Sequence, residues 1–304
     1  MIKLFKVKAV TYGEVLWDVF PTHKKIGGAP LNVALRMKSF GAQSNIISKV
    51  GSDVDGKEIV SFLAENGIDA DIIQISEEYK TGVVNVMINE KGNASYDIFY
   101  PSAWDKIVLN EDIKDIVVDA DVFIFGSLIC RDEESRSTLD ALLEIAKYKV
   151  FDANLRAPYY TTEVLIELML KADFIKFNDE ELWEISRKLE SPYNSFEQNI
   201  KYIAEKTNTK QICVTKGAFG AVLYHNNKFY YNSGYFIKVV DTVGAGDSFL
   251  ASLIVRLLRG KSPQKSLNYA CAIGALVAGQ EGANPKISEK MISNYMKVDK
   301  KYKK

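Results

Sequence analysis

The sequence predicts one large α/β domain with a mostly parallel β-sheet and helices on both faces. From residue 121 to residue 215, short apolar runs alternate with segments of helical periodicity, as they do in successive βα units. A chain of 304 residues with 47% hydrophobic content can also bury a large core. A hairpin pattern at 81–99 interrupts the alternation and predicts a second, smaller sheet.

Each element follows from apolar periodicity and from the turn residues that bound it. Proline and asparagine after the Gly27-Gly28 turn begin a helix that ends at Gly41. The expected strands are 7–13, 14–20, 44–50, 81–89, 93–99, 122–125, 149–151, 174–177, 211–215, 220–224 and 228–231. The other expected helices are one ending at 66–67, then 133–147, 162–171, 179–189, 196–206, one carrying 249–258, and 262–277, with a frayed basic tail at 297–304.

Composition excludes several classes of function. Lysine plus arginine equals aspartate plus glutamate at 39 each, so there is no overall field to attract nucleic acid or an anionic membrane. Three separated cysteines and two histidines argue against a zinc site and a disulfide framework. There is no signal-peptide pattern and no run of eighteen apolar residues, so we expect a soluble cytoplasmic protein.

The turn at 241–249 is the strongest candidate for a site. Small residues at Gly244, Ala245 and Gly246 let the backbone approach a ligand, and the helix that follows directs free N–H groups at an anion. Asp247 is then either the N-terminal cap of this helix or a reactive carboxylate beside the bound anion. By contrast, the G-x-x-x-x-G-K spacing at 51–57 is a helix-capping turn, because Glu58 stands where a P-loop needs a hydroxyl.

Polar residues cluster where other predicted elements end. They follow three consecutive strands, at 152–156, 178–181 and 215–217, on the edge where ligands bind to parallel sheets. Near the N-terminus, Asp18 is either an edge residue or a carboxylate facing a sugar hydroxyl, and Asn32 either caps its helix or reaches a ligand. Small residues at 270–275 allow either close helix packing or a flat ligand.

The small sheet, at roughly 14–28 and 81–103, could form a lid or an interface. Its aromatic residues Tyr96, Phe99 and Trp104 either stack on a ligand or pack in a core.

The residues resemble a known family, the ribokinase-like carbohydrate kinases of phosphofructokinase-B type. Gly27–Ala34 is similar to its N-terminal signature and Asp241–Asp247 to its C-terminal one. The N-x-x-E of Asn178–Glu181 and the T-x-G of Thr215–Gly217 lie between them in the right order, so the resemblance covers essentially the whole chain. The segment 13–21 looks most like bacterial fructokinases.

This resemblance implies a three-layer α/β/α core with a lid, shared between subunits of a homodimer in several members. It implies transfer of phosphate from ATP to a sugar hydroxyl, D-fructose to fructose 6-phosphate, with ribose, 2-keto-3-deoxygluconate or a nucleoside as alternative acceptors and a non-catalytic sugar-binding regulator as a rival. Asp247 would be the base, with the 244–247 amides as an anion hole. The other implied sites are the sugar (Asp18, Gly28, Asn32, Arg156), the nucleotide (Asn178, Thr215, Gly217, Gly274), Mg²⁺ with its waters (Glu181), and a monovalent cation such as K⁺ (Asp241, Val243).

Two further expectations concern chemistry. The helix N-terminus should lower the pKa of Asp247 and make it a weak base in the ground state. Cys271 stands where many ribokinases have asparagine, which argues against a specific hydrogen bond to adenine at that position.

Overall fold

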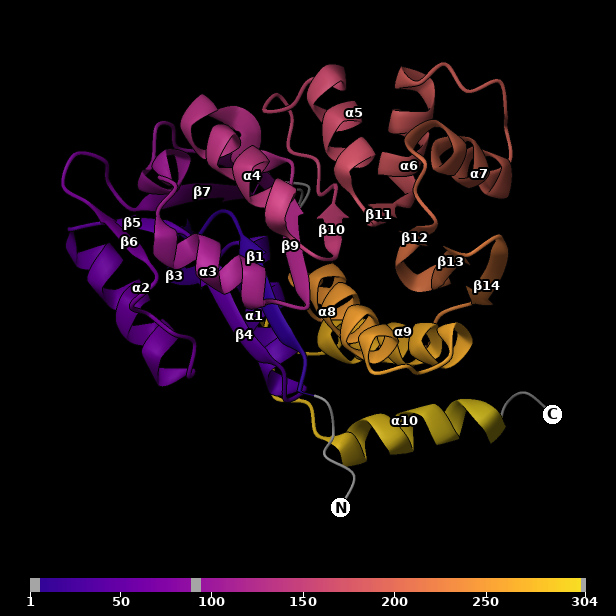
Figure 1. Cartoon of the computed structure of the whole chain (residues 1–304). Coiled ribbons are helices and arrows are strands. Elements are labelled where there is room, and N and C mark those ends of the chain that lie inside the picture. The colour runs from indigo at the N-terminus through magenta and orange to yellow at the C-terminus, as the bar shows by residue number, and fades with distance from the viewer. Residues whose placement is uncertain (1–5, 89–93, 302–304) are drawn as a thin grey trace.

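The computed structural model describes residues 6–88 and 94–301 (Figure 1). Within these residues the largest sheet has eight strands, and six neighbouring strands, from β4 to β12, run parallel. The other two, β13 and β14, add an antiparallel hairpin at one edge. In spatial order they are β14 (Lys228–Asn232), β13 (Ala221–His225), β12 (Gln211–Thr215), β11 (Phe174–Asn178), β10 (Lys149–Asp152), β9 (Val122–Gly126), β1 (Lys8–Tyr12) and β4 (Gln43–Ile47).

Helices cover both faces of this sheet, as predicted. Strand β9 shows why: Val122 and Ile124 pack into one apolar cluster while Phe123 and Phe125 pack into another, because successive side chains of a strand point to opposite faces. One face carries α1 (Ala29–Ser39), α8 (Ala245–Leu258) and α9 (Pro263–Ala278). The other carries α3 (Glu111–Asp119), α4 (Glu133–Ile145), α5 (Thr162–Lys171), α6 (Asp179–Lys188) and α7 (Phe196–Thr207).

The predicted small sheet is present, with strands in the order β3-β2-β7-β8. These are β3 (Lys24–Gly27), β2 (Leu16–Val19), β7 (Gly82–Ile88) and β8 (Ala94–Ile98). Strand β2 pairs with both β3 and β7, so the alternative that Asp18 lies on an edge strand is wrong. The hairpin turn expected at 90–92 and the side chain of Tyr96 lie outside the described residues.

A third, two-stranded sheet joins β5 (Lys49–Gly51) to β6 (Gln74–Ser76), beside α2 (Val54–Glu65). Asp53 caps α2 by accepting a hydrogen bond from the Gly56 amide at 2.8 Å. This confirms that the 51–57 turn caps a helix.

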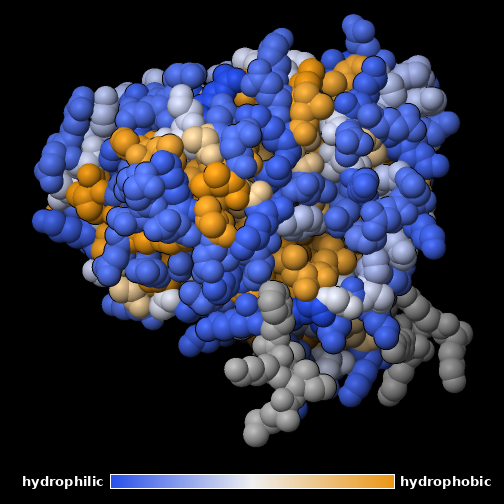
Figure 2. Space-filling view, in the orientation of Figure 1, coloured by the Kyte–Doolittle hydropathy of each residue, from blue (hydrophilic) through white to orange (hydrophobic). Residues whose placement is uncertain are grey.

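The C-terminal region differs from the expected frayed tail. Helix α10 (Glu289–Lys301) packs against α9 through Ile292, which lies with Tyr269 and Ile273 in a small apolar cluster. The sequence analysis expected a frayed tail because lysines are frequent at this end of the chain and the apolar residues of the helix are few. Figure 2 shows mostly hydrophilic residues on the face in view, with hydrophobic ones between them. Among the described residues, every helix is too short or too polar to cross a membrane.

Candidate active site

The glycine-rich turn leads directly into α8, whose first residue is Ala245. Gly244 precedes it in the left-handed conformation with φ of 72°, and a Cβ there would lie 2.6 Å from Ala283, so only glycine fits. The amide of Ala245 donates to the Thr242 carbonyl at 3.2 Å. Within the described part of the chain, the amides of Gly246 and Asp247 have no acceptor and remain available to an anion.

Asp247 is not the cap of α8. Gly244 holds the N-cap position, and the carboxylate of Asp247 accepts a hydrogen bond from Asn32 Nδ2 at 2.9 Å instead. The expected lowering of its pKa is wrong: burial raises the pKa of Asp247 to about 6, and nearby Asp152 adds to the rise. Asn32, Lys176 and Arg156 oppose the shift but do not cancel it. Asp247 is therefore a stronger base than its place at a helix N-terminus suggested.

Asn32 neither caps α1 nor stands free. Besides donating to Asp247, its Oδ1 accepts a hydrogen bond from Asn284 Nδ2 at 2.9 Å, so the amide joins α1, α8 and the 282–285 loop. The chain enters α1 through Gly28, whose φ is 114° and whose added Cβ would collide with the Glu14 carbonyl. The Gly-Gly turn thus places Asn32 against the carboxylate of Asp247.

Besides Asn32, the predicted sugar-binding residues include two charged side chains, Asp18 and Arg156. The carboxylate of Asp18 lies against Gly27, where any side chain would collide with it. Burial raises the pKa of Asp18 to about 6, opposed by the charge of Arg156. Arg156 is exposed, and its charge also lowers the pKa of Asp247. The charge of Arg156 therefore acts on both acids.

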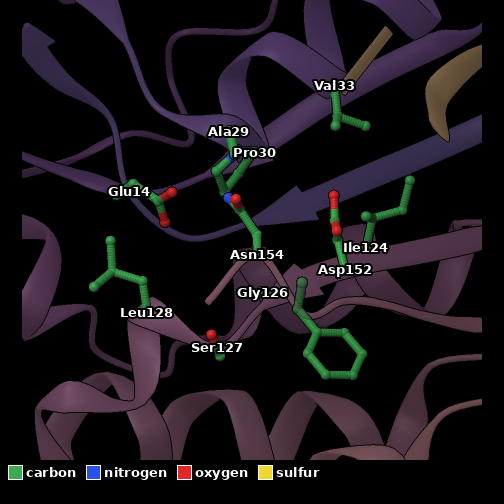
Figure 3. Close-up of a pocket in the computed structure, with 11 residues that line it drawn as sticks. Glu14, Ala29, Pro30, Val33, Ile124, Gly126, Ser127, Leu128, Asp152 and Asn154 are labelled. Atoms are coloured by element: carbon green, nitrogen blue, oxygen red, sulfur yellow. The ribbon is translucent and has the colours of Figure 1, made fainter. Parts of the chain in front are cut away.

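Sequence reasoning missed Glu14, which follows the glycine at the end of β1. It is 5% exposed and lines a cavity of about 20 Å³ with Ser127, Asp152 and Asn154, large enough for about one water molecule (Figure 3). Burial raises the pKa of Glu14 to about 7, while the amide of Ala29 and the charge of Arg156 oppose the shift. The sequence did contain a signal for this residue: Glu14 is an acid just after a buried strand, at the carboxyl edge of the sheet where ligands bind.

Glu14→Gln is expected to raise the free energy of unfolding at alkaline pH but not at acidic pH. Because the folded-state pKa is raised, the favourable contribution of this group is complete below pH 4.5 and is lost as pH rises through 7. The glutamine variant should therefore be more stable than wild type at pH 8, on the order of 1–3 kcal/mol, and similar at pH 4.5. Urea unfolding at the two pH values measures this, with exposed Glu144→Gln as control. An equal effect at both pH values would contradict the assignment.

A buried ion pair lies behind the anion-binding turn. Lys176 Nζ on β11 contacts Asp152 Oδ1 on β10 at 2.7 Å, and both residues are buried. Burial lowers the pKa of Lys176, but Asp152 and Glu181 outweigh it and raise the value to about 12. The ammonium lies 3.8 Å from the position that a Cβ on Gly246 would take. A buried positive charge therefore lies next to the turn that carries the free amides. The only sign of it in the sequence is a lysine within an apolar strand.

The predicted nucleotide-binding residues line one cavity of about 780 Å³, within the range typical of ligand pockets. Asn178, Thr215, Gly217 and Gly274 all lie on its wall, and Ala245 and Gly246 form part of the same lining. Cys271 lies there too, and burial raises the pKa of its thiol to about 12, so it stays protonated. The cavity therefore reaches the anion-binding turn.

Glu181 is connected to this cavity only indirectly. Its two carboxylate oxygens accept hydrogen bonds from the amides of Leu155 (2.9 Å) and Asn178 (2.7 Å), and Asn178 Oδ1 accepts from the Glu181 amide in return. Among the described residues no three His, Cys, Asp or Glu side chains converge on a metal site. This donor set fits Mg²⁺ held chiefly by phosphates and water, because carboxylate oxygens keep a second lone pair for an ordered water.

Asp241 and Val243 lie in the loop that leads to the turn. The carboxylate of Asp241 accepts hydrogen bonds from the amides of Val243 and Gly282, both at 3.0 Å. It thereby fastens the 282–285 loop beside the anion-binding turn.

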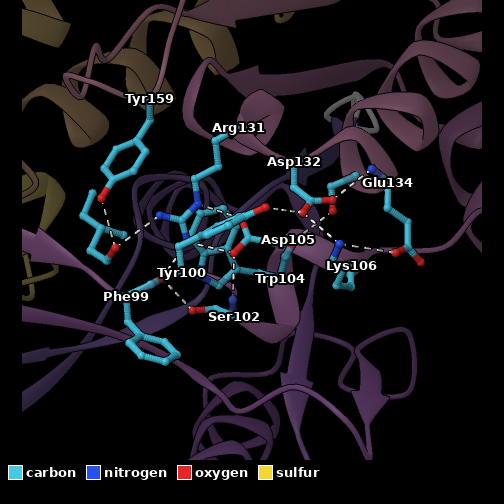
Figure 4. Close-up of polar contacts among 12 residues, drawn as sticks. Phe99, Tyr100, Ser102, Trp104, Asp105, Lys106, Arg131, Asp132, Glu134 and Tyr159 are labelled. Carbon is cyan, nitrogen blue, oxygen red and sulfur yellow. Dashed lines mark hydrogen bonds and ion pairs between the residues drawn. The ribbon is translucent and has the colours of Figure 1, made fainter.

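The small sheet is attached to the core by Arg131, which follows β9 (Figure 4). Its guanidinium donates to both carboxylate oxygens of Asp105, at 2.7 and 2.8 Å, and to the carbonyl of Phe99 at 2.7 Å. The same group lies 4.0 Å from the ring centre of Trp104, which is fully buried. Trp104 therefore packs in a core rather than stacking on a ligand.

Comparison with known proteins identifies the family of this chain. The model of the pfkB family carbohydrate kinases matches residues 2–290. The chain belongs to this family. This pfkB kinase is accordingly a sugar phosphotransferase. It is 28% identical to fructokinase-2 of Solanum habrochaites over 306 aligned positions, covering 91% of this chain and 92% of the relative, and 29% identical to the probable fructokinase-7 of Arabidopsis thaliana, covering 91% and 88%.

Solved structures show the same fold. An uncharacterized sugar kinase of Pyrococcus horikoshii in complex with ATP superposes on this pfkB kinase with a TM-score of 0.81, at 26% identity and covering 95% of this chain and 99% of the other. Fructokinase of Vibrio cholerae, solved with fructose, ADP and potassium ion, gives a TM-score of 0.82 at 23% identity, covering 96% and 99%. The ribokinase-like fold class predicted from the sequence is thereby confirmed.

Proposed function

We propose that this pfkB kinase transfers the γ-phosphate of ATP to D-fructose and forms fructose 6-phosphate. One observation carries the proposal: Asp247 directly follows Ala245 and Gly246, which line the 780 Å³ cavity, and its carboxylate interacts with Asn32 and with the charge of Arg156, which also acts on Glu14 and Asp18. A base between a phosphate site and a hydroxyl-binding site is what phosphoryl transfer requires.

The proposal assigns separate roles to the sugar-binding, nucleotide-binding and catalytic residues. Asp18, Gly28 and Asn32 bind the sugar, and Arg156 reaches the sugar or the transferring phosphate. Asn178, Thr215, Gly217 and Gly274 bind the nucleotide. Within the predicted anion hole at 244–247, the free amides of Gly246 and Asp247 neutralise charge on the transferring group, since the transition state is loose and its charge lies on the equatorial oxygens. Asp247 accepts the proton of the sugar hydroxyl, late in the transfer, when that hydroxyl has become acidic through its bond to phosphorus.

Two cations are part of the proposal. Mg²⁺ would be held by the phosphates and by waters ordered through Asn178 and Glu181, and it would neutralise phosphate charge. Asp241 and the carbonyl of Val243 would bind K⁺, as a potassium ion is present in the Vibrio cholerae fructokinase structure. We expect Asp241→Ala to weaken any stimulation by K⁺, measured as the ratio of kcat with and without it.

Electrostatics favours a neutral acceptor over a sugar acid. Asp18 and Asp247, with pKa values of about 6, are mostly ionised at neutral pH and give the proposed acceptor site two negative charges against the one positive charge of Arg156. A substrate with its own carboxylate, such as 2-keto-3-deoxygluconate, would meet this negative charge in a partly desolvated site. Neutral sugars accept and donate hydrogen bonds to these groups without repulsion. The fructokinase names of the relatives in the preceding comparison support fructose among the neutral sugars.

A coupled assay of ADP release over a sugar panel tests the substrate. We expect kcat/KM for fructose to exceed that for ribose and for 2-keto-3-deoxygluconate by at least about tenfold, the scale of one well-placed polar contact. Turnover only with ribose or the sugar acid would overturn the choice of fructose. Sugar binding without ADP release under any condition would favour the non-catalytic regulator.

Two remaining predictions concern the whole molecule. A homodimer through the small sheet stays a prediction, tested by sedimentation at several concentrations. The cytoplasmic location also stays a prediction.

A further inference from the structure

Arg36 is a buried cation on α1 with no acidic partner among the described residues. It is 3% exposed, and burial lowers the pKa of its guanidinium to about 10, so it remains charged at neutral pH. Its Nη2 is fully buried and makes no hydrogen bond within the described structure. A buried charge without a counterion is costly, and an apolar side chain of similar length usually replaces one at little loss or with a gain in stability.

The two hydrogen bonds of the Arg36 guanidinium go to the residues that follow Asp247 and Asn284 in the chain. Nε donates to Ser248 Oγ at 2.9 Å, and Ser248 directly follows Asp247. Nη1 donates to the Pro285 carbonyl at 3.1 Å, and Pro285 directly follows Asn284.

These contacts repeat those of Asn32 one helical turn further along α1. Asn32 joins Asp247 to Asn284, and Arg36 joins the next residue in each of the same two segments. Residues four apart lie on one face of a helix, so α1 presents two successive bridges to α8 and to the 282–285 loop. Gly244 abuts Ala283 of the same loop, so a shift of this loop would disturb the anion-binding turn as well.

We propose that Arg36 is a positioning residue for phosphoryl transfer, which fixes the first turn of α8 and the 282–285 loop against α1 so that Asp247 meets the acceptor hydroxyl. The inference rests on the proposed role of Asp247 as base. The guanidinium suits this task because its planar fork spans two acceptors in a fixed geometry, which an ammonium does not.

The test compares Arg36→Met and Arg36→Lys with wild type in steady-state kinetics and thermal unfolding. Misplacing a catalytic group by about 1 Å costs on the order of 100-fold, so we expect Arg36→Met to lower kcat by about 10- to 100-fold with both KM values within about threefold. Arg36→Lys, which keeps the charge but reaches one acceptor, should fall between Arg36→Met and wild type.

Arg256→Met is the matched control. Arg256 lies further along α8, stacks on Tyr269 with 4.2 Å from its guanidinium carbon to the ring centre, and also has a buried Nε without a partner. It should change the melting temperature and leave kcat within twofold. If Arg36→Met leaves kcat within threefold of wild type, or if both variants lower kcat alike, the positioning role is wrong.

Smaller variants keep the proposal testable if Arg36→Met does not fold. Ser248→Ala removes the acceptor of the Arg36 Nε–H, and Asn284→Ala removes the bond by which Asn32 holds the same 282–285 loop. Each should lower kcat by about three- to tenfold. Together they should show a non-additive effect, because both act on the same segments. Unchanged kcat in both would overturn the inference. Retained activity in Asp247→Asn would instead overturn the proposed base, so the two failures are distinguishable.

Discussion

Asp247→Asn is expected to lower kcat by about 100- to 10,000-fold while keeping the fold and the affinity for ATP, because loss of a general base has this effect. Asparagine has the same shape and can still accept the hydrogen bond from Asn32, whose Nδ2 lies 2.9 Å from the carboxylate. What it cannot do is accept the proton of the sugar hydroxyl. Steady-state assays and nucleotide titration measure both quantities.

Stability distinguishes a base from a purely structural acid at this position. The folded-state pKa of Asp247 is raised to about 6, so its favourable contribution to stability is complete below pH 3.8 and lost as pH rises through 6. At pH 8 the asparagine variant should therefore be at least as stable as wild type. Asp140→Asn, on α4 and paired with Lys171, is the control and should leave kcat unchanged. Turnover of Asp247→Asn within a few-fold of wild type would remove the catalytic role.

The same raised pKa predicts the pH dependence of turnover. The base must be deprotonated, so kcat/KM should fall below about pH 6 with a slope of one. Asp18 and Glu14, with pKa values raised to about 6 and about 7, can steepen this limb. A profile that stays flat down to pH 4.5 would contradict a base with a raised pKa.

Arg131→Met is expected to lower the free energy of unfolding by about 3–5 kcal/mol, the usual effect of removing one partner of a buried ion pair. The variant leaves the carboxylate of Asp105 fully buried without its bidentate partner, since the side chains of Arg131 and Asp105 are 2% and 0% exposed. It also removes the donors to the Ile98 and Phe99 carbonyls at the end of β8. Urea unfolding measures the change.

A second variant separates the charge effect from the loss of contacts. Adding Asp105→Asn to Arg131→Met removes the uncompensated charge, so the double variant should recover part of the lost stability. The exposed pair of Lys114 and Glu111 provides the control, because Lys114→Met should cost less than about 1 kcal/mol. A loss of under 1 kcal/mol in Arg131→Met would show that this ion pair does not hold the small sheet to the core.

Sequence patterns predicted the elements that are set by hydrophobic periodicity and by turn residues. The alternation of residues 121–215 predicted the parallel sheet, and the Gly244–Gly246 turn predicted a helix start with free amides. Helix α10 was missed because its many lysines suggested a solvated tail, although Ile292, Tyr295 and Met296 recur at helical spacing and pack toward α9. A different limit applies to β3, which is a strand because β2 pairs with it.

From the sequence alone, strand ends and glycine turns indicated where polar groups meet at one edge of the sheet, and the family resemblance implied a role for most of the residues in the proposed site. How those groups behave depends on their surroundings in the folded protein. The pKa of Asp247 rises because burial and Asp152 outweigh the helix N-terminus, and Asn32 binds a carboxylate that lies 215 residues away in the chain. Desolvation and long-range pairing depend on the packed whole, so Glu14, Lys176 and Arg36 became visible as parts of the site only when the chain was folded.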